Sequence, residues 1–462
     1  MKSLVTKKLF KNITYGIFFL HIPIIAYALL PIKTVTTIVG SKPKLAETLE
    51  KSLDDFSLFG LTVNNKNYYG DEIKQIPISV SYPFRDNFKV APIKQPDTNQ
   101  YVDIDGDELN ILDFKDTSQM VWYYTNANNE LVEFKPKASD TFCSLTKAGK
   151  SAPYKITVSG DIVLSSKYGT PNNNEYPNDD ILTHPTKTYT ILEDVGICYA
   201  KPELEPIEAA NSELNHWDKN QGFLIQSNID ASKNFPTTAF YGAKFDLMLS
   251  RKGLSDNYDW KIVKGAELIT ITPDQSQNGN RDFVTVAFNT ENAKNTQIAW
   301  DYVIGSGSGF PVVIQGENKV TKKIIEYSFI ITKWFSDWDK SIIGQPLAHI
   351  GSATDIANGC LSLDGNYRVS HADEVSNAPM GNNPGDAKFT REIGTVLGEW
   401  GNANQIAYPN SWAASKSQNN QHKRIWLRDT VENKYCDLHM YNAKYHCRDE
   451  GEPKNGLCTA VK

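Results

Sequence analysis

Residues 434–449 read KYCDLHMYNAKYHCRD, and this stretch decides how the end of the chain is interpreted. Aromatic side chains recur along it, which is typical of β-strands. Cys436 and Cys447 lie within the stretch, and Cys360 and Cys458 flank it. Four cysteines permit three pairings, so the sequence alone leaves their connectivity open.

The opposite end of the chain predicts export. Residues 1–12 carry four lysines and no acid, and residues 13–32 form an apolar run. Ala26 and Ala28 provide the small-x-small pattern of a signal-peptidase site. We expect residues 1–32 to be a signal peptide or, if uncleaved, an N-terminal anchor that makes the only membrane contact. Either way the remainder is exported: to the cell surface, to the medium or into the periplasm.

Composition narrows the classes of function. Charged residues make up 22% of the 462 residues, and the net charge is −6. The charges are spread along the chain, so a general affinity for nucleic acid or anionic lipid is not expected. Aromatic residues make up 11%, which together with abundant Tyr and Thr favours pleated sheets. Six cysteines in an exported chain predict three disulfides.

Export also bears on a possible zinc site. Cys436, His439, His446 and Cys447 follow the spacing C-x2-H-x6-H-C, and tetrahedral zinc takes such ligands. An oxidising compartment favours a disulfide between the two cysteines instead. We therefore expect no bound metal, with zinc and unpaired thiols as the alternatives. The two histidines are then exposed or packed residues of a hairpin.

The hydrophobic pattern divides the exported part into a linker at 33–55 and three folded units. We expect an N-terminal β-rich domain at 56–205, an immunoglobulin-like β-sandwich at 206–335 and a third domain at 336–462. Length alone predicts about two to four domains.

Alternating side chains support a β-rich first unit. Residues 154–166 (YKITVSGDIVLSS) alternate apolar and polar positions, which predicts strands with one buried face. Asp105-Gly106 separates two such runs and favours a tight hairpin turn. Cys143 and Cys198 are the only cysteines of this part of the chain, so a bridge between them is the simplest assignment.

The second and third units differ in their patterns. Residues 244–249, 283–286 and 327–331 belong to a series of about seven short strands around Trp260, which favours a sandwich. After residue 336 come the only good helix candidates that follow the signal, at 350–361, 371–376 and 389–398, and then further strands.

Six stretches resemble the adhesion domain of bacterial invasin- and intimin-like surface proteins. They are 195–206 (VGICYAKPELEP), 234–249 (NFPTTAFYGAKFDLML), 258–262 (YDWKI), 327–335 (YSFIITKWF), 359–375 (GCLSLDGNYRVSHADEV) and 391–402 (REIGTVLGEWGN). The resemblance covers residues 185–462 and extends more weakly back to about residue 60. It implies a mainly β protein with tandem immunoglobulin-like β-sandwich domains followed by an α+β C-type-lectin-like domain at 336–462.

The resemblance also implies how the cysteines pair. The lectin-like fold joins a cysteine in its first helix to one in its last strand and adds an inner bridge, which gives Cys360–Cys458 and Cys436–Cys447. In the chain-entropy view, the outer bridge would stabilise by about 4–5 kcal/mol and the inner one by about 3 kcal/mol or less.

Several stretches resemble metal-binding or cofactor-binding motifs but do not match them. Asp103, Asp105, Asp107 and Glu108 look like a calcium loop, but Gly106 and the later residues do not fit the EF-hand pattern, so we expect a turn with exposed acids. The calcium-dependent sugar motif of C-type lectins is incomplete at 408–412 (YPNSW). The glycine run at 305–309 precedes a strand rather than a helix, so it is no phosphate loop. No G-x-S-x-G occurs.

We therefore expect no catalytic residue and no cofactor, and we expect a binding surface in the last domain. Tyr408, Trp412 and Arg424 are the candidate contact residues, because Tyr, Trp and Arg dominate interface hot spots. Trp400 and Trp426 are expected in the core. The sequence thus predicts an adhesin-like protein that binds a host or cell-surface protein or glycan non-covalently. The alternatives are a secreted or periplasmic hydrolase of cell-wall or host polymers and a structural surface component.

Overall fold

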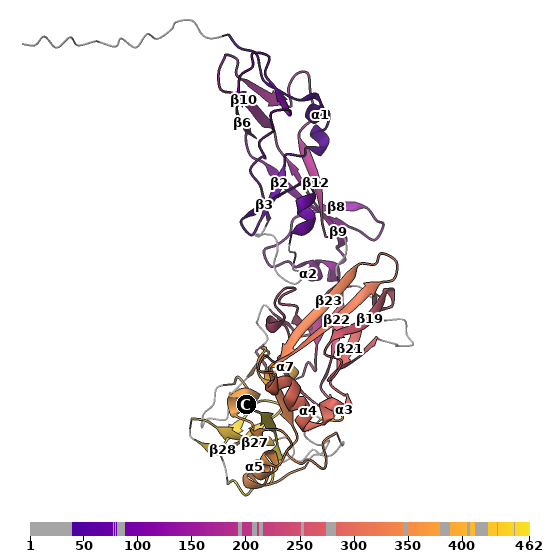
Figure 1. The fold of residues 1–462 in the computed structure, drawn as a ribbon, viewed down its shortest axis with the longest axis vertical. Helices are drawn as coiled ribbons and strands as arrows, with labels where there is room; N and C mark the ends of the chain where they lie inside the picture. Colours follow the sequence, from indigo (N-terminus) through magenta and orange to yellow (C-terminus); the bar gives the residue numbers. More distant parts are fainter. Residues whose placement is uncertain are drawn as a thin grey trace, which may run out of the picture.

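The structure, a computed structural model, is an elongated molecule in which three regions follow one another along the long axis (Figure 1). We call residues 39–192 the N-terminal region, 196–336 the central region and 337–462 the C-terminal region. The structure describes residues 39–462 except 77, 79, 81–87, 193–195, 206–209, 212–215, 251–253, 274–282, 345–348, 379–388, 404–406, 412–423, 432 and 448. The expected export signal lies outside the described residues.

The chain is mainly β, with several antiparallel sheets, as predicted. In the N-terminal region, the sheets have the strand orders β12-β9-β7-β8, β11-β10-β6, β3-β2-β4 and β1-β5. The elements are β1 (Lys44–Leu45), α1 (Glu47–Glu50), β2 (Gly60–Val63), β3 (Lys66–Tyr69), β4 (Phe88–Val90), β5 (Tyr101–Val102), β6 (Leu109–Phe114), β7 (Gln119–Thr125), β8 (Leu131–Phe134), α2 (Phe142–Lys147), β9 (Ser151–Ser159), β10 (Ile162–Ser166), β11 (Asn173–Tyr176) and β12 (Thr186–Leu192).

In the N-terminal region, the alternating apolar residues of the strands are buried, as predicted. Ile156, Val158, Ile162 and Leu164 are fully buried, while the residues between them on β9 and β10 remain partly exposed. The prediction of a hairpin at Asp105-Gly106 is wrong. The chain does turn there, but β5 pairs with β1 and β6 pairs with β10, so the turn links two different sheets.

The central region packs two sheets on one core, with the orders β15-β16-β13-β18-β21-β20 and β19-β22-β23. Phe245 of the first sheet contacts Phe329 of the second, with ring centroids 5.8 Å apart. The elements are β13 (Ile197–Lys201), β14 (Ala210–Asn211), β15 (Trp217–Asp218), β16 (Gly222–Leu224), β17 (Thr238–Phe240), β18 (Lys244–Leu249), β19 (Tyr258–Lys264), β20 (Thr270–Pro273), β21 (Phe283–Ala287), α3 (Glu291–Lys294), α4 (Thr296–Trp300), a π-helical turn (Asp301–Gly305), β22 (Phe310–Asn318), β23 (Ile324–Ile331) and β24 (Lys333–Ser336).

The C-terminal region combines short helices with the sheet β29-β28-β27-β30. Its elements are α5 (Ala353–Leu361), β25 (Tyr367–Val369), α6 (Ala372–Val375), β26 (Phe389–Thr390), α7 (Val396–Trp400), β27 (Arg424–Asp429), β28 (Lys434–His439), β29 (Tyr445–His446), β30 (Asn455–Gly456) and β31 (Cys458–Ala460).

The expected helices are found only in part. Residues 350–361 and 371–376 contain α5 and α6, and Ser352 caps α5 by accepting a hydrogen bond from the Asp355 amide. The helix expected at 389–398 is wrong over its first half. Residues 389–390 form β26, which pairs with β14, and Thr395 caps a helix that begins only at Val396. Helices α3 and α4, which Thr290 and Asn295 cap, were not predicted.

The expected domain boundaries do not coincide with the sheets. Strand β13 precedes residue 206, yet it belongs to the central sheet. Strands β17 and β24, which precede residue 336, form one sheet with β31 and β25 in the order β17-β24-β31-β25. One hydrophobic core extends from Ile197 to Ala460. The central and C-terminal regions therefore form one packed body rather than two independent domains.

A disulfide joins the N-terminal region to the central region. Cys143 of α2 is bonded to Cys198 of β13. Cys198 packs in the core of the N-terminal region, and its neighbour Ile197 packs in the core of the central region. Lys147 adds an ion pair to Asp218 at 3.7 Å. Strand β13 thus lies between two cores and is fixed to both.

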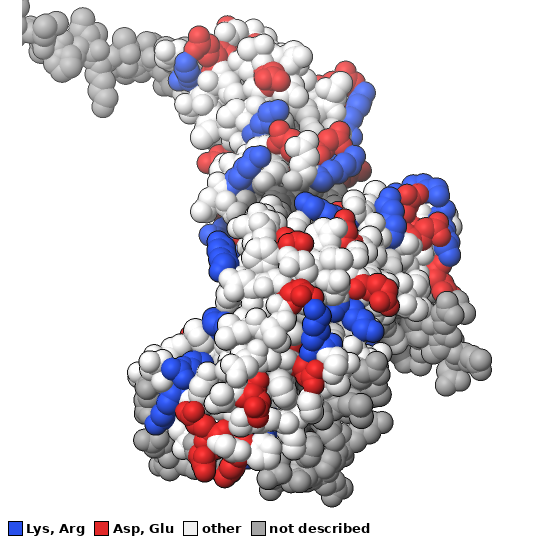
Figure 2. All heavy atoms as spheres, turned by 60° about the horizontal axis from the view of Figure 1, so that its bottom comes forward, with Lys and Arg blue, Asp and Glu red and all other residues white. Residues whose placement is uncertain are grey.

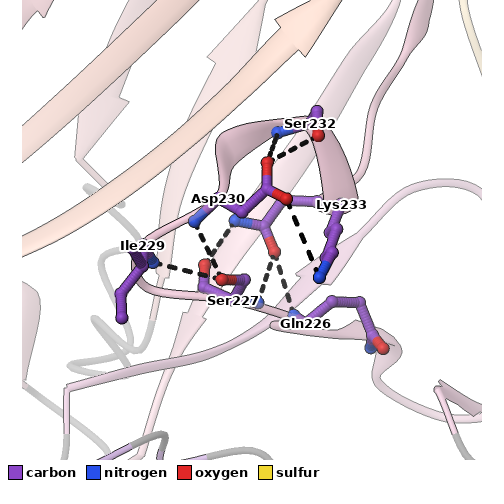
Figure 3. A network of polar contacts seen from close by, with 7 residues as sticks. Gln226, Ser227, Ile229, Asp230, Ser232 and Lys233 are labelled. Carbon is purple, nitrogen blue, oxygen red and sulfur yellow. Dashed lines mark hydrogen bonds and ion pairs between the residues drawn. The ribbon is translucent and has the colours of Figure 1, made fainter. Parts of the chain in front are cut away.

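A loop between β16 and β17 strengthens the same junction. Ser227 Oγ accepts hydrogen bonds from the amides of Ile229 and Asp230, and Asp230 accepts one from the Ser232 amide at 3.1 Å (Figure 3). The fully buried Asn234 closes the loop by accepting from the Gln226 amide at 2.9 Å. The loop held in this way directs Asn228, whose Nδ2 donates to the Ile78 carbonyl of the N-terminal region at 3.0 Å.

Candidate functional site in the C-terminal region

We expected Tyr408 to be a contact residue on the surface, and this prediction is wrong. Only 1% of its surface is exposed. Its hydroxyl donates to the Trp400 carbonyl and accepts from the Glu203 amide, both at 3.0 Å. Its ring packs edge-on against Phe240 at 5.5 Å. Burial also raises the pKa of the Tyr408 hydroxyl. The residue connects three segments of the core.

Arg424 is also a poor contact residue, because its guanidinium is paired with the fully buried Asp437 across β27 and β28. Its side chain is only 11% exposed. Trp412 lies outside the described residues. Trp400 and Trp426 are fully buried, as expected for core residues.

A buried polar cluster that the sequence did not predict lies beside Tyr408. The Glu399 carboxylate accepts hydrogen bonds from the amides and hydroxyls of Thr237 and Thr238, and from the Gly394 amide at 2.9 Å. Burial raises the pKa of Glu399, and the hydrogen bonds from the two threonines oppose that rise. These bonds tie α7 to the start of β17, across the seam between the central and C-terminal regions.

Arg391 completes this cluster from the other side. It is 1% exposed, and it donates to the carbonyls of Glu203, Gly398 and Glu399. Its guanidinium lies 4.0 Å from the centre of the Trp217 ring. Burial lowers the pKa of Arg391 to about 10. Because every group here has an internal partner, the cluster orients the two regions and offers no binding surface.

The cysteines form the three expected pairs, Cys143–Cys198, Cys360–Cys458 and Cys436–Cys447. The zinc alternative at Cys436 and Cys447 therefore does not hold, because sulfur atoms in a disulfide are not thiolate ligands. Asp429 lies close to that bridge, but it cannot make a metal site with bonded sulfurs.

A second group of possible ligands lies in the N-terminal region. Oxygens of Asp103, Asp105 and Asp107 lie within 4.8 Å of one another. The loop that carries them is held by Asp103 Oδ1, which accepts from the Asp105 amide at 2.9 Å. Carboxylates so arranged could hold a hard cation such as calcium. Acidic turns of this kind also occur without any ion.

A cleft opens at the seam between the central and C-terminal regions, and we call it the seam cleft. It is a small hollow, with interior room for about one water molecule. Tyr241 and Lys294 of the central region line it, with Asp337, Gly344 and Asn410 of the C-terminal region. Segments far apart in sequence therefore contribute polar side chains to one hollow.

The charges on the molecular surface give no single dominant patch on the side that Figure 2 shows. Acidic and basic side chains are interspersed there along all three regions. On that side, recognition would have to rely on local groups rather than on a broad field.

Comparison with known proteins gave no match: no family model, no curated protein and no solved structure is significantly similar to this chain. Among the described residues, no helix has both the length and the apolar character needed to cross a membrane. The apolar run at 13–32 lies outside those residues.

Proposed function

We propose that the protein is an exported adhesin that binds a host or cell-surface partner through its C-terminal region, without turnover. One observation carries the proposal: the cysteines and cores join the three regions into one long body with a disulfide-bonded end. Such a body holds its end away from the surface that bears it. A preorganised end loses less entropy on binding.

The arrangement of the central region supports an immunoglobulin-like sandwich. Two mainly antiparallel sheets pack face to face, and their inward side chains interdigitate in one core. The buried Tyr327 hydroxyl donates to the Phe235 carbonyl, which ties β23 to the segment before β17. The resemblance to invasin- and intimin-like proteins led us to expect a domain of this kind before the C-terminal one.

The C-terminal region supports a lectin-like assignment through its disulfides. Cys360 lies on α5 and Cys458 on the last strand, β31, while Cys436 and Cys447 form the inner bridge. This is the arrangement that the resemblance implies. The outer bridge closes a loop with a sequence separation of 98 residues.

A hydrolase is less well supported. Polysaccharide hydrolysis commonly uses two carboxyl groups that converge on one bond. Among the residues that line the seam cleft, Asp337 is the single carboxylate.

Binding to intact host cells tests the proposal. Labelled protein spanning residues 33–462 should bind saturably. The double variant Val431→Ser, Tyr441→Ser removes two exposed apolar side chains of the C-terminal region, 89% and 41% exposed, and should weaken binding at least tenfold.

The matched control replaces Val320 and Ile324 by serine in the central region, where they are 88% and 51% exposed. This control should bind like the unmodified chain. Absence of saturable binding would refute the adhesin, and equal loss in both variants would place the contact outside the C-terminal region.

A further inference from the structure

The acidic turn between β5 and β6 contains a buried oxygen that the fold leaves without a partner. Asp103 Oδ1 accepts hydrogen bonds from the Asp105 amide at 2.9 Å and from the Asp107 amide at 3.4 Å. Asp103 Oδ2 is shielded from solvent, yet no donor among the described residues bonds to it. A buried polar atom without a partner is costly, so this oxygen indicates a ligand that the protein chain does not provide.

The charges around this oxygen indicate the kind of ligand. Oxygens of Asp103, Asp105 and Asp107 lie within 4.8 Å of one another, and no basic side chain of the described residues forms an ion pair with any of them. Lys167, which follows β10, pairs with Glu108 instead. Carboxylates at such distances repel one another, and burial increases the cost. A bound cation removes this repulsion and satisfies the Asp103 oxygen at the same time.

Packing around the turn keeps the three carboxylates together. Asp105 Oδ2 accepts from the Ser41 amide, at the start of the described chain. Asp107 Oδ2 lies 3.8 Å from the position that a Cβ on Gly169 would occupy. Three segments that are far apart in sequence therefore meet at this turn. The strands β6 and β10 beside it lie at the end of the molecule opposite to the C-terminal region (Figure 1).

The chemistry of the ligand atoms distinguishes between metal ions. All three side chains offer carboxylate oxygens, which suit hard cations, whereas zinc and other transition metals favour nitrogen and sulfur. Calcium–oxygen distances of about 2.3–2.6 Å place opposite ligands about 4.6–5.2 Å apart, so one calcium ion can reach all three carboxylates. Calcium also accepts irregular geometry, whereas magnesium requires nearly ideal octahedral coordination. A turn whose side chains are already held by hydrogen bonds therefore suits calcium.

We propose that this turn binds one calcium ion through the carboxylates of Asp103, Asp105 and Asp107, with water completing the coordination. The sequence predicted a turn with exposed acids, and the buried Asp103 oxygen is the observation that it could not provide. Asp105 is exposed, so the site is open on one side. We expect a Kd of about 0.1–1 mM, as in other extracellular modules.

The ion has a structural consequence for the N-terminal region. Asp105 contacts both the ion and the Ser41 amide, so calcium fixes the turn to the first described residues. Because the unfolded chain lacks the site, 10 mM calcium should raise the ratio of folded to unfolded N-terminal region about 10- to 100-fold. This role is independent of the partner that the C-terminal region binds.

Isothermal titration calorimetry on metal-free protein spanning residues 33–462 tests the site, with calcium chloride and magnesium chloride as titrants. One calcium ion should bind, and magnesium should bind at least tenfold more weakly. Asp103→Asn and Asp107→Asn should each weaken calcium binding at least tenfold. Asparagine keeps an acceptor oxygen at each position, so these variants remove the charge and preserve the hydrogen bonds that hold the turn.

The matched control, Asp116→Asn, removes an exposed acid of the same region outside the turn and should bind calcium like the unmodified chain. Amide hydrogen exchange locates the ion, because calcium should slow exchange at residues 39–41 and 103–107 and leave the C-terminal region unchanged. If Asp103→Asn fails to fold, Asp107→Asn decides alone.

Three results would overturn the proposal. The first is the absence of saturable calcium binding at millimolar concentrations. The second is binding that neither turn variant weakens, or that Asp116→Asn weakens equally, since such binding is adventitious. The third is a preference for magnesium.

Discussion

Asp337 makes stability depend on pH in a direction that follows from its burial. Its pKa is about 7 in the folded chain against an ordinary value of 3.8. Between these values the folded state keeps a proton that the unfolded state has released. The free energy of unfolding therefore falls as pH rises from about 4 to about 7, by at most about 4 kcal/mol in total.

The variant Asp337→Asn should remove this dependence, because an amide stays neutral and still accepts from the Asp339 amide. Denaturant unfolding at pH 4, 6 and 8 measures it. The variant and the unmodified chain should be equally stable at pH 4, and the variant should be more stable at pH 8, by about 1–4 kcal/mol. A difference that stays constant across this range would show that Asp337 is not the titrating group.

At the scale of single residues, the sequence pattern predicted buried residues better than exposed contact residues. The alternation around Ile156 and Val158 identified buried positions correctly, because side chains on a strand point alternately to either face. Tyr408 was assigned to the surface because aromatic residues are common in interfaces, yet the same ring fills a core equally well. Glu399 and Arg391 could not be recognised, since their partners at 203 and 237–238 are remote in sequence.

At the scale of elements, β13 is the strand through which the N-terminal and central regions are joined. The Cys143–Cys198 bridge has a sequence separation of 55, so its loss should cost about 4 kcal/mol or less. The double variant Cys143→Ser, Cys198→Ser should also allow the two regions to change their relative orientation. Small-angle scattering should then give a broader distribution of interatomic distances.

The variant Cys436→Ser, Cys447→Ser is the matched control, because it also removes one disulfide but within a single hairpin. It should lower stability and leave the overall shape unchanged. If neither variant changes the scattering profile, the packing of β13 between two cores suffices to hold the regions in line.

Among the helices with a local capping residue, α5 was expected but α3 and α4 were not, and the pairings between distant strands were not predicted either. The helix expected at 350–361 is α5, which begins at Ala353 after the capping residue Ser352. Strand β26 was taken for helix because its pairing with β14 joins residues far apart in the chain. The parallel pairing of β17 with β24 has no sequence signature either. Long-range pairing overrides local propensity in such cases.

At the scale of the whole molecule, sequence identified a mainly β chain with three disulfides but placed a boundary at 336 where the core is continuous. Apolar patterning shows which residues are buried, and it does not show which other residues bury them. Trp400 of the C-terminal region packs on Phe235 and Phe240 of the central region, at 5.0 and 5.5 Å between ring centroids. A boundary drawn between them would divide one core.

This continuity predicts how fragments behave. Residues 336–462 alone would lose β17 and nearly all of β24, which leaves β31 with β25 as its one partner. Glu399 would also lose Thr237 and Thr238 and become a buried carboxylate with the Gly394 amide as its one remaining donor. We expect this fragment to lack fixed tertiary packing, with weak near-ultraviolet circular dichroism and no cooperative unfolding.

A fragment of residues 196–462 that carries Cys198→Ser retains the whole shared core, so it should unfold in one cooperative transition. A cooperative transition in the shorter fragment would show instead that the C-terminal region is an independent domain. The seam cleft would then lie between two bodies that can move, and Lys294 and Asp337 would face each other only when these dock. The fragment comparison therefore decides whether the seam cleft is preformed.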